Sequence, residues 1–190
     1  MKTINKYITE KLKISKPKKV KHTLFPIDFD ELSRIIKSEI QLNGENCDLN
    51  HIDISNIDDL SCLFAHTNTF DNINGYGLMN FNGDISNWDV SNVINMHALF
   101  YESDFNGDIS NWDVSKVKNM EWMFANSFFN GDISEWDVSN VKNMYSMFRH
   151  SEFNQNISKW KIKPNCATKF MFLECGIRQS YKPKESNKII

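Results

Sequence analysis

The sequence predicts an α/β repeat fold, a solenoid of about five coils, and two observations carry this prediction. Units of 24 residues that begin at Phe81, Phe105, Phe129 and Phe153 share nearly the same sequence. Within each unit the apolar pattern also changes from alternation to helical spacing. A fixed period of this length is typical of a solenoid, in which each unit buries its apolar side only against its neighbours.

Each unit is expected to contain a strand, a short helix and a turn. In the first strong unit, Trp88 and Val90 alternate with polar residues, as in a strand with one buried face. The segment 82–84 (Asn-Gly-Asp) predicts a turn, because Gly and Asn tolerate positive φ. The stacked strands would form a small parallel sheet. The helix is expected where apolar residues recur at helical spacing, at Val93, Met96, Leu99 and Phe100.

Two columns of aromatic residues are expected to form the core. They are interpreted as buried columns, and not as a platform for stacking bases or sugars, because each Trp shares the inward side of the strand with a Val. The columns are Trp88, Trp112, Trp136 and Trp160, and Phe100, Phe124, Phe148 and Phe172.

The repeat continues upstream in a weaker form. Residues 53–64 match residues 89–100 at an offset of 36, which places a 12-residue insertion within 65–80. Before it, residues 28–44 predict a capping helix that starts with a capping box. The expected division is a basic, partly helical extension over 1–27, the capping helix over 28–44, the repeat over 45–176 with its insertion loop at 65–80, and a polar flexible tail over 177–190.

Positions that differ between the strong units are expected to face solvent. They include 94, 97, 98 and their equivalents, and the ends of the units at 101–104, 125–128 and 149–152. Four of these residues are candidates for partner binding, because aromatic residues and Arg dominate interface energetics. Neutral drift on a tolerant surface is the alternative interpretation. The candidates are Tyr101, Trp122, Tyr145 and Arg149.

A column of carboxylates is expected on the outer face of the sheet and is added to the candidate surface. Stacked carboxylates repel unless they are hydrogen bonded, so Ser91, Ser115 and Ser139 are expected to hold them. Calcium is the alternative partner, but the repeat lacks the Gly-Gly-x-Gly-x-Asp spacing of calcium-binding coils. The column consists of Asp89, Asp113 and Asp137.

The N-terminal 22 residues differ in charge from the rest of the chain. They carry eight Lys and one Glu, a net charge of +7, whereas the whole chain has a net charge of −2. Three interpretations remain open: a docking peptide, an electrostatic anchor to nucleic acid or an acidic membrane, and a solvated tail. The docking peptide is favoured because one face of a short helix is apolar, at Ile4, Tyr7, Ile8 and Leu12.

The sequence offers no enzymatic motif, so we expect no catalytic residue, no cofactor and no metal. The five His residues are scattered and no Gly-rich phosphate loop is present. The four cysteines, at 47, 62, 166 and 175, form no C-x-x-C pair and are expected to be free thiols, with a bridge within 47/62 or 166/175 as the alternative. No apolar run is long enough to span a membrane, and the first 25 residues lack the apolar core of a secretory signal.

The repeats resemble the BspA-type leucine-rich repeat family, in its subclass of 24- to 25-residue units found in bacterial surface lipoproteins. The resemblance rests on the strong units and on the lead-in at 46–55, and it covers about residues 30–176. It implies a right-handed leucine-rich-repeat solenoid that is non-enzymatic and serves adhesion or protein binding at the cell surface. More weakly, residues 4–14 resemble leaders on proteins of tailed phages.

The expected function is therefore a protein–protein interaction module on a BspA-like leucine-rich-repeat scaffold. It would bind a macromolecular protein partner, not nucleic acid, through its sheet face, its variable positions and the 65–80 loop. The alternative is a structural or packaged component of a phage particle, recruited by the N-terminal segment. We expect a monomer that is cytoplasmic or virion-associated, whereas the family resemblance implies the cell surface.

Overall fold

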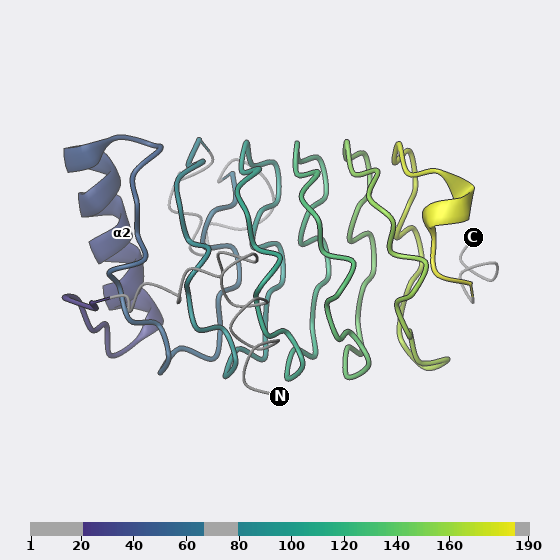
Figure 1. Cartoon of the computed structure of the whole chain (residues 1–190), viewed down its shortest axis with the longest axis horizontal. Coiled ribbons are helices and arrows are strands. Elements are labelled where there is room, and N and C mark those ends of the chain that lie inside the picture. Colours follow the sequence, from purple (N-terminus) through teal and green to yellow (C-terminus); the bar gives the residue numbers. More distant parts are fainter. Residues whose placement is uncertain (1–20, 67–79, 185–190) are drawn as a thin grey trace, which may run out of the picture.

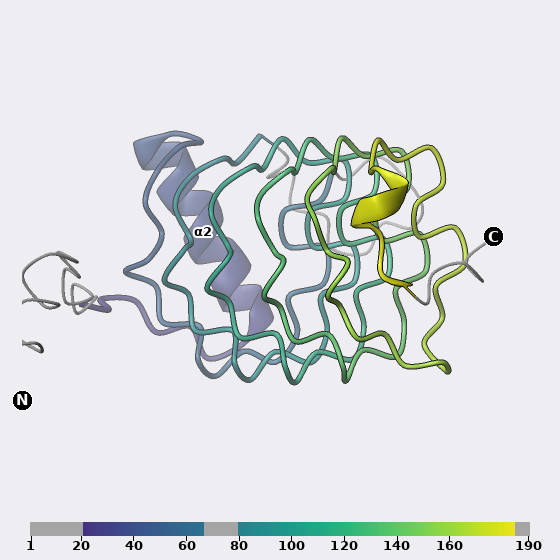
Figure 2. The ribbon, with the colours of Figure 1, turned by 45° about the vertical axis from the view of Figure 1, so that its right-hand side comes forward.

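A computed structural model describes residues 21–66 and 80–184 of the chain. It contains the α-helix α2, Phe29–Asn43, and the short 3-10 helix η1, Gln179–Tyr181. Between them the chain runs in successive turns that lie side by side along the long axis of the molecule (Figure 1). We call each such turn a winding. α2 lies at the N-terminal end of the stacked windings and η1 at the C-terminal end (Figures 1 and 2).

The predicted α/β leucine-rich-repeat solenoid, with a strand and a helix in every coil, is wrong. Across residues 21–66 and 80–184, neighbouring windings are joined by isolated parallel bridges, and no strand or sheet forms. The windings consist of turns and irregular chain. The longest series of bridges connects Asp59, Asn95, Asn119, Asn143 and Ala167.

The strand expected around Trp88 and Val90 is replaced by two turns. The Trp88 N–H donates to the Ile85 carbonyl at 3.1 Å, and the Val93 N–H donates to the Val90 carbonyl at 2.9 Å. Between these turns, the Asp89 carboxylate accepts a hydrogen bond from the backbone N–H two residues later. Asp side chains that bond nearby backbone groups compete with strand pairing, so the chain bends where a strand was expected.

The helix expected over residues 93–100 is excluded by its backbone conformation. Ala98 has φ 51°, a left-handed conformation that no α-helix contains. Its N–H donates at 2.8 Å to the carbonyl of Glu121 in the next winding instead of to its own turn. The apolar spacing therefore reflects a series of tight turns. Positive φ recurs at the equivalent positions Cys62, Trp122, Ser146 and Phe170, and a second series lies four residues later, at Glu102, Asn126, His150 and Glu174.

Two columns of stacked phenyl rings run along the core. In the first column, Phe100, Phe124 and Phe148 are fully buried with centroids 5.6 Å apart. A second column, Phe81, Phe105, Phe129 and Phe153, packs against the first with centroids as close as 4.2 Å between Phe124 and Phe129. The predicted burial of the Phe column is confirmed except at its end, where Phe172 is half-buried.

The predicted burial of the four Trp residues is confirmed, with exposed fractions of 4–5%. A buried indole N–H needs an acceptor, and each one finds it in the preceding winding. Trp112, for example, donates to the Ile85 carbonyl at 3.2 Å. The same bond joins Trp88 to Leu49, Trp136 to Ile109 and Trp160 to Ile133.

The repeated glycines serve close packing and not a left-handed turn, which corrects the role expected of the Asn-Gly-Asp segment. Gly44 is the one described glycine with positive φ. At Gly107 an added Cβ would lie 2.8 Å from the ring of Phe105, well inside van der Waals contact. The ring therefore folds back onto a residue that must lack a side chain.

The helix expected at residues 28–44 is present as α2. The Asp28 side chain accepts a hydrogen bond from the Glu31 N–H at 2.8 Å, which caps the helix N-terminus. Leu32 and Ile36 are fully buried and belong to the core, so α2 covers the end of the stacked windings. The division of the chain into four segments stays a prediction, since residues 1–20 and 185–190 lie outside the described residues.

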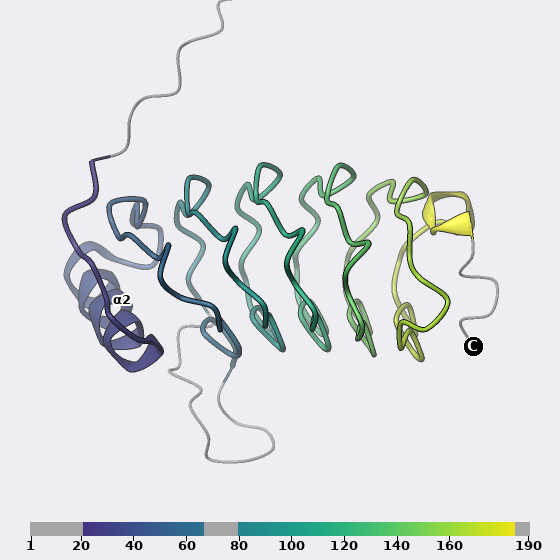
Figure 3. The same cartoon turned by 90° about the horizontal axis from the view of Figure 1, so that it is seen from below.

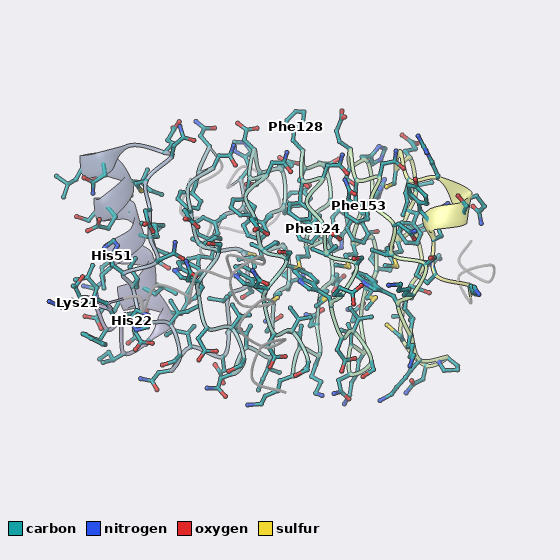
Figure 4. All side chains as sticks on the ribbon, viewed as in Figure 1. Lys21, His22, His51, Phe124, Phe128 and Phe153 are labelled. Atoms are coloured by element: carbon teal, nitrogen blue, oxygen red, sulfur yellow. The ribbon has the colours of Figure 1, made fainter. Side chains whose placement is uncertain are left out.

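Replacing one core ring should destabilise the protein far more than replacing an exposed one. Phe124 is fully buried and Phe128 is 58% exposed, four residues away in the same winding (Figure 4). Phe124→Ala is expected to lower the free energy of unfolding by about 3–5 kcal/mol, because it leaves a cavity in the column. Phe128→Ala should change it by less than about 0.5 kcal/mol. Urea unfolding measures both, and equal effects would contradict the buried column.

A second pair of variants tests the packing of the rings on glycine. Gly107→Ala should destabilise the protein by about 1–3 kcal/mol, because the new Cβ meets the Phe105 ring. Gly176 has no atom within 4 Å of an added Cβ and no positive φ, so Gly176→Ala serves as the control. In thermal unfolding, the melting temperature of the Gly176→Ala control should equal or slightly exceed that of the unaltered protein. Equal melting temperatures for both variants would show that Phe105 does not lie on Gly107.

Candidate functional site

A row of aromatic side chains from successive windings forms the candidate site. The ring centroids of Tyr101 and Trp122 are 5.6 Å apart and packed edge to face. Trp122 and Tyr145 are 6.2 Å apart, and Tyr145 and Phe170 are 5.7 Å apart. We call Tyr101, Trp122, Tyr145 and Phe170 the aromatic row. Three of the four predicted partner-binding candidates thus lie in one continuous row, although they come from different repeats.

Small residues in the neighbouring windings make room for these rings. Trp122 occupies a left-handed position with φ 59°, and its N–H donates to the Tyr145 carbonyl at 3.0 Å. The equivalent positions on either side are held by Ala98 and Ser146, which are buried. The expectation that all variable positions face solvent is therefore wrong, because some vary in order to accommodate a neighbour's ring. Buried variable positions are Ala98, Ser103, Ala125, Ser127, Ser146 and Ser151.

Polar groups border the aromatic row. The guanidinium of Arg149, the fourth candidate, lies 5.8 Å from the Trp122 ring centroid, within the range of a cation–π contact. The Trp122 indole N–H donates to the Glu121 carboxylate at 3.2 Å, and the other Glu121 oxygen lies 3.8 Å from His97 Nδ1. Within residues 21–66 and 80–184, Arg149 Nε and Ser146 Oγ are buried without a hydrogen-bond partner.

The carboxylate column is exposed but does not lie on a sheet, because no sheet forms. Each carboxylate accepts a hydrogen bond at 3.0 Å from the backbone N–H of the Ser two residues later, as expected. Hydrogen bonds from Ser115 lower the pKa of Asp113, and those from Ser139 lower the pKa of Asp137. These carboxylates stabilise turns, which gives Asp89, Asp113 and Asp137 a structural role whether or not they bind a partner.

Sequence reasoning missed the last member of the row. Phe170 aligns with Trp122 two repeats later. The candidates, however, were chosen from positions that differ among the units that begin at Phe81, Phe105 and Phe129, and Phe170 lies in the next unit. Lys169 accompanies it, with Nζ 4.8 Å from the Phe170 ring centroid. Extending the comparison by one repeat would have found both residues.

Two other candidate segments lie outside the described residues. The predicted docking segment, with Ile4, Tyr7, Ile8 and Leu12, falls within residues 1–20, and most of the 65–80 loop falls within 67–79. Both stay predictions.

The cysteines are free, as expected. Burial raises the pKa of all four thiols, and that of Cys166 to about 11, so the reactive thiolate form is disfavoured. In the part of the chain that the structure describes, no three His, Cys, Asp or Glu side chains are grouped as metal ligands. No helix there is long and apolar enough to span a bilayer.

These features define a protein of stacked 24-residue windings with a row of aromatic side chains. The chain belongs to the family described as Mycoplasma protein of unknown function, DUF285, whose model matches residues 73–182. That match replaces the BspA-type assignment, which was wrong. No curated protein and no solved structure matches the chain.

The carboxylate turns predict a specific loss of stability in acid. The pKa of Asp113 is lowered from 3.8, so its stabilising effect is complete above pH 3.8 and is lost as the pH falls through the lowered pKa. Asp113→Asn keeps an oxygen acceptor for Ser115 but does not titrate. The free energy of unfolding should therefore differ between the variant and the unaltered protein at pH 6, and the difference should shrink toward zero near pH 2. A difference independent of pH, measured by urea unfolding, would contradict the assignment.

Proposed function

We propose that this chain is a non-enzymatic interaction module that binds a protein partner through the aromatic row and Arg149. The observation that supports this proposal is the convergence of Tyr101, Trp122 and Tyr145, from three windings, into rings 5.6 and 6.2 Å apart. Aromatic residues and Arg are the types enriched where binding energy is concentrated in protein interfaces.

The rings are held in place before any partner arrives. Each ring contacts the next, and the backbone beneath them is bonded from winding to winding, as between Trp122 and Tyr145 at 3.0 Å. Binding would then cost little side-chain entropy, which is the usual penalty for an interface built on long flexible residues.

The non-enzymatic part of the proposal rests on the repeated carboxylates, which are hydrogen bonded within their own turns. Asp89, Asp113 and Asp137 recur at the same position and are each bonded to their own turn. A catalytic carboxylate is normally placed against a single substrate, whereas these repeat with the architecture.

We propose further that the module acts as a monomer on a protein partner and not on nucleic acid. The phage-particle alternative, and with it the cytoplasmic or virion-associated location, depends on residues 1–14. Those residues lie outside the described part of the chain, so this alternative stays a prediction from sequence.

Quantitative partner capture tests the proposal. Trp122→Ala and Tyr145→Ala should each reduce the amount of captured partner by about tenfold or more, as expected of an interface anchor. Phe128→Ala removes an exposed aromatic ring outside the row and should leave capture unchanged. Circular dichroism first confirms that each variant is folded. Equal capture by all variants, or an equal loss in the Phe128 control, would exclude the aromatic row as the binding surface.

A further inference from the structure

In the segments that follow the bridge residues, alternate backbone N–H groups donate to carbonyls of the next winding. Met96, Ala98, Phe100 and Glu102 donate their N–H groups to carbonyls of the next winding, at 2.8–3.0 Å. The equivalent residues of the next two windings do the same. Each of these segments therefore directs alternate N–H groups toward the C-terminal end of the stack, whereas the N–H groups of Lys118 and Asn119, at the start of the segment, donate to the preceding winding.

In the last described winding the equivalent N–H groups meet no following winding among the described residues. Within the described residues, four of its backbone N–H groups have no acceptor, although their equivalents in every earlier winding are bonded. We call these groups the open edge. They belong to Thr168, Phe170, Phe172 and Glu174.

The described residues after Gly176, 177–184, pair their backbone with the other part of the last winding. The Arg178 N–H donates to Asn154 Oδ1 at 3.0 Å, and the Tyr181 carbonyl accepts from the Ile157 N–H at 3.0 Å. These bonds place residues 178–181, including η1, over the beginning of the last winding, at the C-terminal end seen in Figure 3. The open edge follows later in that winding and receives no backbone partner from this segment.

We propose that the open edge binds an extended acidic segment of a protein partner, which adds to the stack as one further winding. A row of alternate, unpaired N–H groups is a template for backbone pairing with another chain. Two basic side chains lie directly on the edge residues, and the one acidic residue of the edge, Glu174, has its carboxylate 2.9 Å from His150 Nδ1. Lys169 Nζ is 4.8 Å from the Phe170 ring centroid, and Lys182 Nζ is 5.3 Å from that of Phe172.

A second copy of the chain fits this edge poorly. Two open edges would both present donors, so they could not satisfy each other. The acceptor end of another copy is the first winding, and α2 lies against that end with Leu32 and Ile36 in the core. The acidic extended segment is the occupant that matches both the donors and the charge.

Amide hydrogen exchange of the full chain, followed by NMR, tests this proposal. The probe is a 12-residue peptide, Asp-Asp-Asn-Met-Glu-Trp-Met-Phe-Ala-Asn-Asp-Asp, whose central eight residues copy 119–126, a segment that already pairs in this manner. Without peptide, the amides of the open edge should exchange about tenfold or more faster than their bonded equivalents at 144, 146, 148 and 150. Saturating peptide should slow the open-edge amides by about tenfold or more.

Matched variants distinguish binding of the peptide at the open edge from a general attraction of the acidic peptide to basic residues of the protein. Lys169→Glu combined with Lys182→Glu should weaken peptide binding, measured by fluorescence anisotropy, by about tenfold. The control, Lys37→Glu combined with Lys116→Glu, makes the same change in net charge elsewhere and should leave the affinity within about twofold. Thr168→Pro removes one open donor without breaking an existing bond and should also weaken binding.

Three results would overturn the proposal. The first is protection of the open-edge amides from exchange without peptide, which would mean that another part of this chain occupies the edge. If that protection rises with protein concentration, a second copy of the chain occupies the edge. The peptide could bind without protecting these amides. The control variant could lose as much affinity as the edge variant. None of these results bears on capture through Trp122, so this inference and the proposed function fail independently.

Discussion

The in-register stacking of phenyl rings is the constraint on which the rest of this structure depends. Phe100, Phe124 and Phe148 lie 5.6 Å apart, and this spacing is possible only if each winding places its ring directly on the ring of the one before. Between Phe100 and Phe148 each winding takes 24 residues, whereas Phe64 stacks on Phe100 at the same 5.6 Å across 36 residues, so the column keeps its register although that winding carries extra residues. The buried Trp residues and the side-chain-free position at Gly107 are further consequences of the same register.

Hydrogen bonding explains how such windings remain stable without a sheet. Each backbone segment divides its bonds between local turns and the adjacent winding, as at Leu99 and Ala98, whose N–H groups donate to Met96 and Glu121. Asparagines connect the windings as well: the Asn106 N–H donates to Asn82 Oδ1, and the same bond recurs in the following windings. These bonds pair backbone groups of the windings that no sheet could pair.

The sequence predicted the repeat period, the burial of the aromatic columns and the N-terminal helix, and it named Tyr101, Trp122 and Tyr145 as candidates. It did not predict that their rings meet in one row or that Phe170 continues it. It failed on secondary structure for a physical reason. Apolar residues at 93, 96, 99 and 100 mimic helical spacing, but a left-handed residue at Ala98 breaks the helix, and no propensity rule indicates that Ala adopts positive φ. Likewise, Trp88 and Val90 alternate as in a strand, but the Asp89 side chain bonds the local backbone and bends the chain. The burial of Ser146 could not be foreseen because it depends on the large residues of neighbouring windings.

The central claim, that successive windings stack in register, is tested most directly by nuclear Overhauser contacts between selectively labelled Phe rings. The account predicts contacts between the rings of Phe100 and Phe124 and between those of Phe124 and Phe148, each with centroids 5.6 Å apart. It predicts no direct contact between Phe100 and Phe148, which are separated by the intervening ring. Absence of the neighbour contacts, or a contact that skips a winding, would contradict the stacked register and every conclusion drawn from it.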